Sequence, residues 1–485
     1  MSFAAPFRRS LMPRTTRTVG SRYIYPCSKR RCFASVTSSG PPETPREPEG
    51  TREVPMTVGD GGSGTVRPVR QRHGSDRLVF PGAVNSKFTN RLQFRMSDPN
   101  EAIETYRVMD TEGQIVDENH GLDFESLKEQ TLKMYNSMVT ISIMDQIMYD
   151  SQRQGRISFY IVNAGEEGIA VGSAAALSDQ DVLYAQYREA GVLMYRGFTL
   201  EEFMSQCFSN RKDNGQGRNM PIHYGSKRLN FHPISSTLAT QLPHAAGAGY
   251  ALKMEGTPAC AVTYFGEGAA SEGDFHAALN IAATRGCPTL FICRNNGYAI
   301  STPTLEQYKG DGIASRGVGY GIDTIRVDGN DTWAVYKATK EARELAIAQK
   351  KPVLIEAMSY RVSHHSTSDD SFAYRARVEV EDWKRRDNPI TRLRKFMELR
   401  NWWDQEKDTQ LRTQARKDLL KAFNAAEREK KPAISKLWED VYDKPTREQW
   451  RQMEEMKDIL DRYGEEYDLD MYDGGKSGVV SKLKK

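Results

Sequence analysis

Apolar positions along the chain form short continuous runs separated by helix-spaced stripes, a pattern that predicts an α/β fold. Residues 261–265 and 289–293 are apolar runs typical of buried strands, and a stripe at helical spacing lies between them. The stripe consists of Phe275, Leu279 and Ala282. We therefore predict one strand–helix–strand unit over residues 261–302. Its helix is placed from near Ser271, with Asp274 as part of a shortened capping box.

The same patterns recur on both sides of this unit. Further strands are predicted at residues 105–109, 158–162, 182–184, 323–327 and 352–358. Helices are predicted within residues 124–155, at the small-residue stretch 171–177 and at 332–349. The methionine-rich stripe of the first helix is interpreted as core: Met134, Met138, Ile141, Met144 and Met148. Alternating strands and helices predict a mostly parallel sheet flanked by helices, and the charged stretch 392–463 predicts a helical C-terminal subdomain.

Polar residues follow the two strands of the central unit. Gly266-Glu267-Gly268 comes after the first strand, and Asn295-Asn296-Gly297-Tyr298 comes after the second. Parallel strands place both loops at one edge of the sheet, where open α/β sheets bind ligands. A carboxylate, an amide oxygen and a backbone carbonyl suit Mg²⁺, and the glycines followed by a helix N-terminus suit a diphosphate. A Rossmann dinucleotide turn fits less well, because Ser271 holds the third glycine position.

Several other polar residues leave two interpretations open from sequence alone. Arg188, just after the strand at 182–184, is either a surface charge or a diphosphate ligand. His223 is at least as well explained by a structural role as by ligand binding. The hydroxyl-rich turn at 234–241 would by default cap the helix that follows. The pair His364-His365, beside Ser, Thr and Asp, could belong to a solvated loop.

Composition and charge separate the N-terminal region from the body. The 485 residues suggest about two or three domains at roughly 100–200 residues each. Residues 1–33 contain eight Lys or Arg and no acid, so the formal charge of +4 for the whole chain becomes −4 for the rest. Such a start is typical of a mitochondrial transit peptide, with a disordered basic arm for nucleic acid as the alternative. The body does not favour nucleic-acid binding, and no apolar run approaches the ~18 residues of a membrane helix.

The predicted organisation has five parts: a transit peptide at 1–33, a disordered linker at 34–75, an α/β domain at 76–391, the helical subdomain at 392–470 and a mobile tail at 471–485. The linker is rich in Pro, Glu, Gly and Ser and has few large apolar groups. Four cysteines of the body lack metal-ligand spacing and are expected to be buried and reduced: Cys207, Cys260, Cys287 and Cys293.

The central unit resembles a known family. G-[DE]-G followed after nearly thirty residues by N-N is the thiamine-diphosphate fingerprint, and it appears here as GEGAASEGD and RNNGYAIST. These versions are similar to the alpha subunits of branched-chain 2-oxo acid dehydrogenase decarboxylases. The resemblance extends from about Phe80 to about Asp470 and includes ISFYIVNAGEEG, QYREAGVLMYRG, ISSTLATQ and SHHSTSDD. It implies the thiamine-diphosphate-binding fold.

The resemblance also implies roles for individual residues. Cofactor contacts are implied for Gln186, Tyr187, Arg188, Ser236, Leu238, Gly268, Ala269, Arg294 and His365. Magnesium ligands are implied at Glu267, Asn296 and Tyr298, and potassium ligands at Ser235, Thr237, Thr240 and Gln241. His365 is also implied to be catalytic, by contacting the diphosphate or moving protons near pH 7. Ser366 matches a serine phosphorylated by a dedicated kinase, whereas Ala376 stands where relatives often have a second serine.

The expected activity is oxidative decarboxylation of branched-chain 2-oxo acids in the mitochondrial matrix, with acyl transfer to the lipoyl group of an acyltransferase core. The chain has one cofactor-type domain and no second domain of equal size. The resemblance implies that the glutamate that acts on the aminopyrimidine ring comes from a beta subunit, in an α₂β₂ heterotetramer. A kinase and a phosphatase are possible further partners, and neither nucleic acid nor membrane is expected. The alternatives are a pyruvate dehydrogenase alpha subunit and a non-catalytic scaffold of the same fold.

Overall fold

The computed structural model describes residues 101–475, residues 89–94 and four short strands at 55–56, 67–68, 77–80 and 83–87. The predicted transit peptide lies outside the described residues, as do the linker apart from β1 and β2 and most of the tail. The chain divides into two compact units, Met1–Asn90 and Arg91–Lys485. In the first unit, β1 (Pro55–Met56) pairs antiparallel with β2 (Arg67–Pro68), and β3 (Arg77–Phe80) pairs antiparallel with β4 (Ala83–Lys87).

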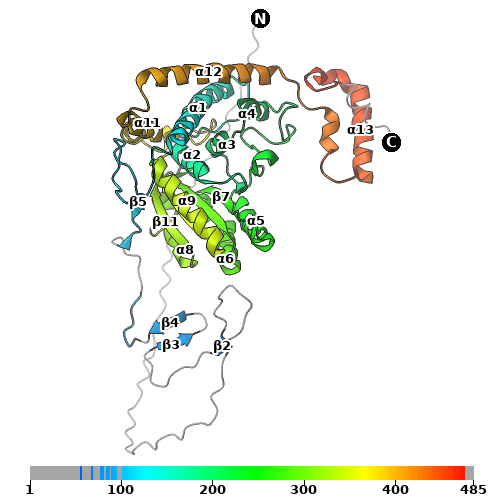
Figure 1. Ribbon diagram of the computed structural model, residues 1–485. Helices are drawn as coiled ribbons and strands as arrows, with labels where there is room; N and C mark the ends of the chain where they lie inside the picture. Colours follow the sequence, from blue (N-terminus) through cyan, green and yellow to red (C-terminus); the bar gives the residue numbers. More distant parts are fainter. Residues whose placement is uncertain are drawn as a thin grey trace, which may run out of the picture. The chain divides into compact units, whose positions relative to one another are not determined.

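The second unit is built on a six-stranded parallel sheet in the order β5-β11-β12-β8-β7-β6 (Figure 1). Its strands are β5 (Thr105–Tyr106), β6 (Val182–Tyr184), β7 (Ala261–Gly266), β8 (Thr289–Asn295), β11 (Asp323–Asp328) and β12 (Val353–Met358). The register pairs Gly266 of β7 with Arg294 of β8, so the loops after both strands begin at the same edge. The predicted strand–helix–strand unit is confirmed.

Helices cover both faces of the sheet because side chains alternate across each strand. Phe265 and Phe291 point to a core shared with α5 (Gln241–Glu255) and α6 (Gly273–Arg285). Tyr264 and Ile292 point to the larger core on the other face. That core includes residues of α1 (Lys128–Arg153), α2 (Glu167–Ala176), α3 (Ala190–Tyr195), α4 (Leu200–Cys207) and α9 (Thr332–Gln349). The predicted α/β class and the helix at 332–349 are confirmed.

The methionine stripe of α1 is core, as predicted, because all five of its residues are buried. The four cysteines of the body are free and buried, also as predicted. Two C-terminal helices, α11 (Pro389–Leu399) and α12 (Gln405–Arg428), add Phe396, Leu419 and Phe423 to the same core as α1. The remaining elements are β9 (Tyr298–Ala299), β10 (Thr302–Pro303), α7 (Thr304–Gln307), α8 (Ala314–Gly319), α10 (Arg377–Arg386) and α13 (Arg447–Tyr463).

Two predicted strands are wrong or too long. The run 158–162 forms no strand, because its backbone hydrogen bonds are not made to a neighbouring strand. Tyr160 bonds through its N–H and its carbonyl to Thr367, and the Val162 carbonyl accepts from Arg188. The run 105–109 keeps only the two residues of β5. Its later amides, those of Val108 and Met109, both donate to the carboxylate of Asp331, each at 2.7 Å.

The predicted start of α6 also needs correction. The helix begins at Gly273, preceded by a single 3₁₀ turn at Ala269–Ser271, and no side chain caps it. Ser271 is not a cap because its hydroxyl accepts a hydrogen bond from the Gln307 amide at 2.8 Å. Asp274 lies in the first turn, where its charge still complements the helix dipole.

Within the part of the chain that the structure describes, no helix is both long enough and apolar enough to cross a membrane.

Candidate active site

The predicted magnesium ligands come together at the carboxyl edge of the sheet. Glu267 follows β7, and its Oε2 accepts a hydrogen bond from the backbone N–H of Asn296, after β8, at 3.4 Å. The Asn296 Nδ2 donates to Glu166 Oε1 at 2.7 Å, and its Oδ1 accepts from the Tyr298 N–H at 3.1 Å. Both the nitrogen and the oxygen of the Asn296 side-chain amide are therefore hydrogen-bonded, and one lone pair of Oδ1 remains free to bind another partner.

The other oxygen of Glu267 is buried and has no hydrogen-bond partner. Burial raises the pKa of this carboxyl to about 7, and the nearby Glu166 carboxylate adds to the shift. A buried carboxylate oxygen without a donor requires either a proton or a cation. The donor set of one carboxylate, one amide oxygen and one carbonyl is of the kind that Mg²⁺ takes when phosphate oxygens complete its shell. The residues present therefore fit a magnesium ion.

Among the described residues, no three or more His, Cys, Asp or Glu side chains lie together so that they could hold a metal ion. A magnesium site with a single carboxylate does not belong to that class, so this result and the fit at Glu267 are compatible.

Two arginines and two glutamates form a buried charge cluster beside the predicted metal ligands. Arg294 forms ion pairs with Glu166 and with Glu189, and all three side chains are at most 2% exposed. Although burial opposes it, Arg294 and Arg188 hold the pKa of Glu166 below its usual value. Burial raises the pKa of Glu189 despite the attraction of Arg294. The guanidinium of Arg294 thus already faces two carboxyl groups.

Arg188 has a less compensated charge than Arg294. Its Nε lies 3.6 Å from Glu166 Oε1, and its terminal nitrogens donate to the main-chain carbonyls of Val162 and, at 2.7 Å, His365. Two of its partners are therefore neutral. The charge of Arg188 is compensated by fewer carboxylates than that of Arg294. Arg188 is therefore the better placed of the two predicted arginines to bind an anion such as a diphosphate.

The predicted cofactor residues Gln186 and Tyr187 lie in the same cluster. Gln186 Oε1 accepts from the Gly266 N–H at 2.9 Å and from Arg294 Nη2 at 3.4 Å. The ring of Tyr187 meets that of His365 edge-on, with 5.6 Å between centroids. These contacts tie the loop after β6 to the ends of β7 and β8.

His365 lies in a largely buried environment beside two arginines. Burial, together with the positive charges of Arg188 and Arg361, lowers the pKa of its imidazole to about 3. This shift favours the neutral imidazole in the cofactor-free chain. Proton transfer by His365 stays a prediction. A neutral ring can still form hydrogen bonds, and its Nδ1 lies 3.4 Å from Arg188 Nη2.

Gly268 is required by packing and not by backbone conformation. Its φ lies in the ordinary helical range, but a Cβ atom here would lie 2.7 Å from the Cβ of Ala299. The loop after β7 and the loop after β8 can approach each other only because Gly268 has no side chain. Ala269, the next predicted cofactor residue, is buried at the start of the 3₁₀ turn.

The turn before α5 carries the predicted potassium ligands and two cofactor residues. Ser235, Ser236, Thr237 and Leu238 are all exposed in this chain. The Thr240 hydroxyl donates to the Thr237 carbonyl at 3.1 Å, so it does not cap α5. Gln241 is buried and donates to the Tyr264 carbonyl at 3.0 Å. Potassium binding by this turn stays a prediction.

His223 is a structural partner of Ser236. Its Nδ1 lies 3.1 Å from the Pro221 carbonyl, which can only accept, so Nδ1 carries the proton. Its Nε2 then accepts from the Ser236 hydroxyl at 2.7 Å. Both nitrogens are thereby used, which favours the structural interpretation of this histidine.

The loop after β12 contains the predicted phosphorylation site. Ser366 is 8% exposed, and its hydroxyl accepts from the Ser368 N–H at 3.2 Å. Asp369 accepts from the His365 N–H and from the Tyr374 hydroxyl, each at 2.7 Å. This network joins the loop that carries Ser366 to the histidine of the site.

Sequence reasoning missed Glu166 and Glu189, which compensate the buried arginines. The available signal was the acidic pair Glu166-Glu167 in a largely apolar stretch directly before the small-residue helix.

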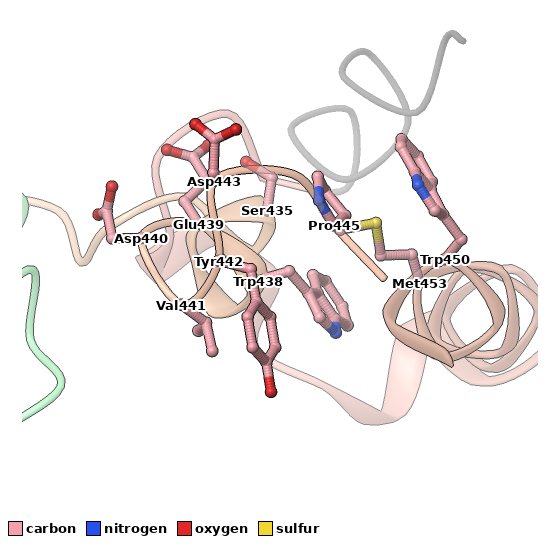
Figure 2. Close-up of a pocket in the computed structure, with 10 residues that line it drawn as sticks. All are labelled: Ser435, Trp438, Glu439, Asp440, Val441, Tyr442, Asp443, Pro445, Trp450 and Met453. Atoms are coloured by element: carbon pink, nitrogen blue, oxygen red, sulfur yellow. The ribbon is translucent and has the colours of Figure 1, made fainter. Parts of the chain in front are cut away.

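The larger hollows of the surface lie elsewhere. One of about 760 Å³ lies among aromatic and acidic residues between 435 and 453, and its lining includes Trp438 and Tyr442 together with Trp450 and Met453 of α13 (Figure 2). Another of about 820 Å³ is lined by residues 209–218 and 431–472. Neither lining includes a predicted site residue, so cavity size does not locate the site.

Comparison with known proteins agrees with the geometry. The profile of the family described as "Dehydrogenase E1 component" matches residues 135–435. The "2-oxoisovalerate dehydrogenase subunit alpha, mitochondrial" of Homo sapiens is 54% identical over 398 residues, covering 82% of this chain and 89% of that protein. The protein of the same name from Caenorhabditis elegans is 53% identical over 391 residues, covering 80% and 90%.

A plant relative, the "2-oxoisovalerate dehydrogenase subunit alpha 2, mitochondrial" of Arabidopsis thaliana, is 52% identical over 368 residues, covering 76% of this chain and 77% of that protein. All three names are those of the branched-chain enzyme, which confirms the family predicted from the sequence over the pyruvate dehydrogenase alternative. The chain belongs to the dehydrogenase E1 component family, among the mitochondrial 2-oxoisovalerate dehydrogenase alpha subunits.

Proposed function

We propose that this protein is the alpha subunit of a mitochondrial decarboxylase that acts on branched-chain 2-oxo acids such as 3-methyl-2-oxobutanoate and passes the acyl group to lipoamide. The names of its relatives support the substrate class and the compartment. The observation that carries the proposal is the partnerless, buried oxygen of Glu267 beside Asn296 at the carboxyl edge of the sheet. Membership of the family implies thiamine diphosphate as cofactor.

The site residues would divide the work between metal and diphosphate. Glu267, the Asn296 side-chain oxygen and the Tyr298 carbonyl would hold Mg²⁺, and Arg188, Arg294 and His365 would face the diphosphate. Gln186 and Tyr187 position the loop that carries Arg188, and Gly268 with Ala269 allows close approach of the backbone. When bound, thiamine diphosphate supplies the carbanion that adds to the keto carbon and the electron sink for CO₂ loss.

The active site is completed by a beta subunit in this proposal. Ser236 and Leu238, the predicted residues of the pocket wall, are exposed, and the Leu238 side chain is 38% exposed. In this proposal a second chain covers this wall and closes the cofactor site against solvent. The beta subunit would also supply the glutamate for the aminopyrimidine ring, so the active form is an α₂β₂ heterotetramer that delivers its product to a lipoyl-bearing acyltransferase.

Two further features belong to the same proposal. The turn formed by Ser235, Thr237, Thr240 and Gln241 would hold a structural K⁺. Ser366 would be phosphorylated by a dedicated kinase and restored by a phosphatase, with control exerted through the loop that joins it to His365. Because Ser366 is largely buried, the loop must open before a kinase can reach the hydroxyl.

Reconstitution tests the assignment. The purified chain alone should show no decarboxylation, and adding the beta subunit should restore it, with 3-methyl-2-oxobutanoate turned over in preference to pyruvate. Substantial turnover by the lone chain would contradict the shared site, and a preference for pyruvate would contradict the substrate class.

A further inference from the structure

Asp145 is a buried acid on α1 that none of the roles above uses. It is 4% exposed, and its Oδ2 accepts from the Asn163 N–H at 2.5 Å. Its Oδ1 accepts from the Tyr160 hydroxyl and from Asn163 Nδ2, each at 3.0 Å. All three donors belong to residues 160–163, which we call the strut. Asp145 forms no ion pair among the described residues. These three hydrogen bonds therefore compensate the loss of hydration that its carboxylate undergoes on burial.

The strut has no strand partner to fix it. Residues 160–163 are not part of the sheet, in contrast to the strands on which the other site loops are mounted. Buried backbone outside regular structure needs hydrogen-bond partners other than a neighbouring strand for its polar groups. For the strut, Asp145 meets the Asn163 N–H, and the Tyr160 N–H donates to Thr367 Oγ1 at 3.2 Å.

Other main-chain atoms of the strut face the candidate active site. The Val162 carbonyl accepts a hydrogen bond from Arg188 Nη1. The Tyr160 carbonyl accepts from the N–H of Thr367, next to Ser366, at 3.1 Å. The position of the strut therefore fixes the position of the Val162 carbonyl, the acceptor for Arg188 Nη1.

We propose that Asp145 is a positioning residue for the diphosphate site: it holds the strut, so that the Val162 carbonyl orients the guanidinium of Arg188. This inference rests on the proposed function, in which Arg188 binds the diphosphate. A free arginine side chain loses rotamer entropy when it binds a ligand, whereas an oriented one has already lost that entropy before the ligand arrives. Loss of Asp145 should therefore weaken cofactor binding and leave the chemical step of the loaded enzyme intact.

The test measures thiamine diphosphate affinity and turnover of the assembled complex with its beta subunit. In Asp145→Asn the size is kept, but the amide nitrogen cannot accept from the strut. The Kd for thiamine diphosphate should rise about tenfold, as is usual when an outer partner of a ligand is removed. At saturating cofactor, kcat should stay within about twofold of the wild type. An unchanged Kd, or a fall in kcat without a change in Kd, overturns the proposal.

Two companion variants guard against a general effect on folding. Tyr160→Phe removes one of the three donors and should give a smaller rise in Kd in the same direction. Ser151→Ala is the matched control, because Ser151 is also buried on α1, but its hydroxyl donates only within the helix, to the Ile147 carbonyl at 2.6 Å. A rise in Kd for Ser151→Ala equal to that for Asp145→Asn would overturn the proposal.

A double-mutant cycle with Arg188→Ala separates this inference from the proposed function. If Asp145 acts through Arg188, the double variant binds cofactor no more weakly than Arg188→Ala alone. Fully additive losses would overturn the positioning role. If Arg188→Ala itself leaves the Kd unchanged, the proposed role of Arg188 fails and the inference fails with it. If only Asp145→Asn leaves it unchanged, the inference alone fails.

Discussion

Glu267 combines burial, a missing hydrogen-bond partner and proximity to Asn296, and it is the residue whose change should affect metal binding most directly. Glu267→Gln keeps the size of the side chain and removes the charge that attracts Mg²⁺. In titrations of the assembled complex, magnesium-dependent binding of thiamine diphosphate should weaken at least about tenfold, or ~1.4 kcal/mol. The melting temperature should not fall, because a buried uncompensated acid is removed.

The control for this change is Glu272→Gln, which alters an exposed acid a few residues further along the same loop. It should leave cofactor affinity unchanged. Equal affinity of wild type and Glu267→Gln at limiting Mg²⁺ would refute the metal assignment.

Gly268 and Gly273 allow packing to be separated from backbone conformation. A Cβ at Gly268 would lie 2.7 Å from that of Ala299, whereas a Cβ at Gly273 would meet nothing within 4 Å. Gly268→Ala should therefore lower the free energy of unfolding by about 1–3 kcal/mol. Gly273→Ala, in the first turn of α6, should be neutral or stabilising by up to about 1 kcal/mol. Urea unfolding would measure both, and equal effects would contradict the close approach of the two loops.

At the residue scale, the sequence was most informative where the chemistry is local. The proximity of Glu267 and Asn296 could be predicted because each directly follows a strand, and parallel strands bring such residues to one edge. Glu189 was missed because its role, compensating Arg294, depends on a side chain more than a hundred residues away. The lowered pKa of His365 was missed for a similar reason, since it arises from burial and from Arg188 and Arg361.

At the scale of elements, predictions succeeded where hydrophobic periodicity decides the structure. The predicted bounds of α9 match the structure, in which Asp331 caps the N-terminus by accepting hydrogen bonds from the Trp333 and Ala334 N–H groups. The runs 105–109 and 158–162 have the composition of strands, yet side chains distant in sequence bind the backbone groups of Val108, Met109, Tyr160 and Val162. Apolar composition predicts burial, but it does not determine whether a second strand or a carboxylate satisfies the backbone.

The loop 359–376 should respond as a unit to charge at Ser366. Ser366→Glu places a carboxylate at a buried position near Asp369, which already binds the His365 N–H and the Tyr374 hydroxyl. Repulsion should displace the loop and lower kcat/KM of the complex about tenfold or more. Trypsin should also cleave faster after Arg375, whose guanidinium is now bound to the Arg361 and Ser363 carbonyls.

Ser368→Glu is the matched control, because Ser368 is exposed in the same loop. It should retain activity and protection from trypsin. Full activity of Ser366→Glu, or equal losses in both variants, would count against a switch at Ser366.

At the scale of the whole molecule, the two cores on opposite faces of the sheet hold the carboxyl edge fixed from both sides. The site residues come from the ends of β6, β7, β8 and β12, so their positions depend on the sheet and on both layers of helices. The larger core also buries acids that no described cation directly pairs, notably Asp145 on α1 and Glu167 on α2. Such groups link the stability of the entire fold to pH.

Burial raises the pKa of Asp145 to about 7 and that of Glu167 to about 8. In the unfolded chain such carboxyls titrate near 4, so between about pH 5 and pH 8 these two acids bind more protons in the folded protein than in the unfolded chain. Their contribution to the free energy of unfolding should therefore fall as the pH rises through this window. Glu167→Gln, a neutral mimic of the protonated acid, should flatten the decline and be more stable than wild type at pH 8 by about 1–3 kcal/mol. Unfolding of the cofactor-free protein at several pH values measures this, with exposed Glu129→Gln on α1 as the control that keeps the wild-type slope. A Glu167→Gln profile parallel to that of the wild type would show that Glu167 is ionised in the folded protein and that its burial is compensated by contacts other than a proton.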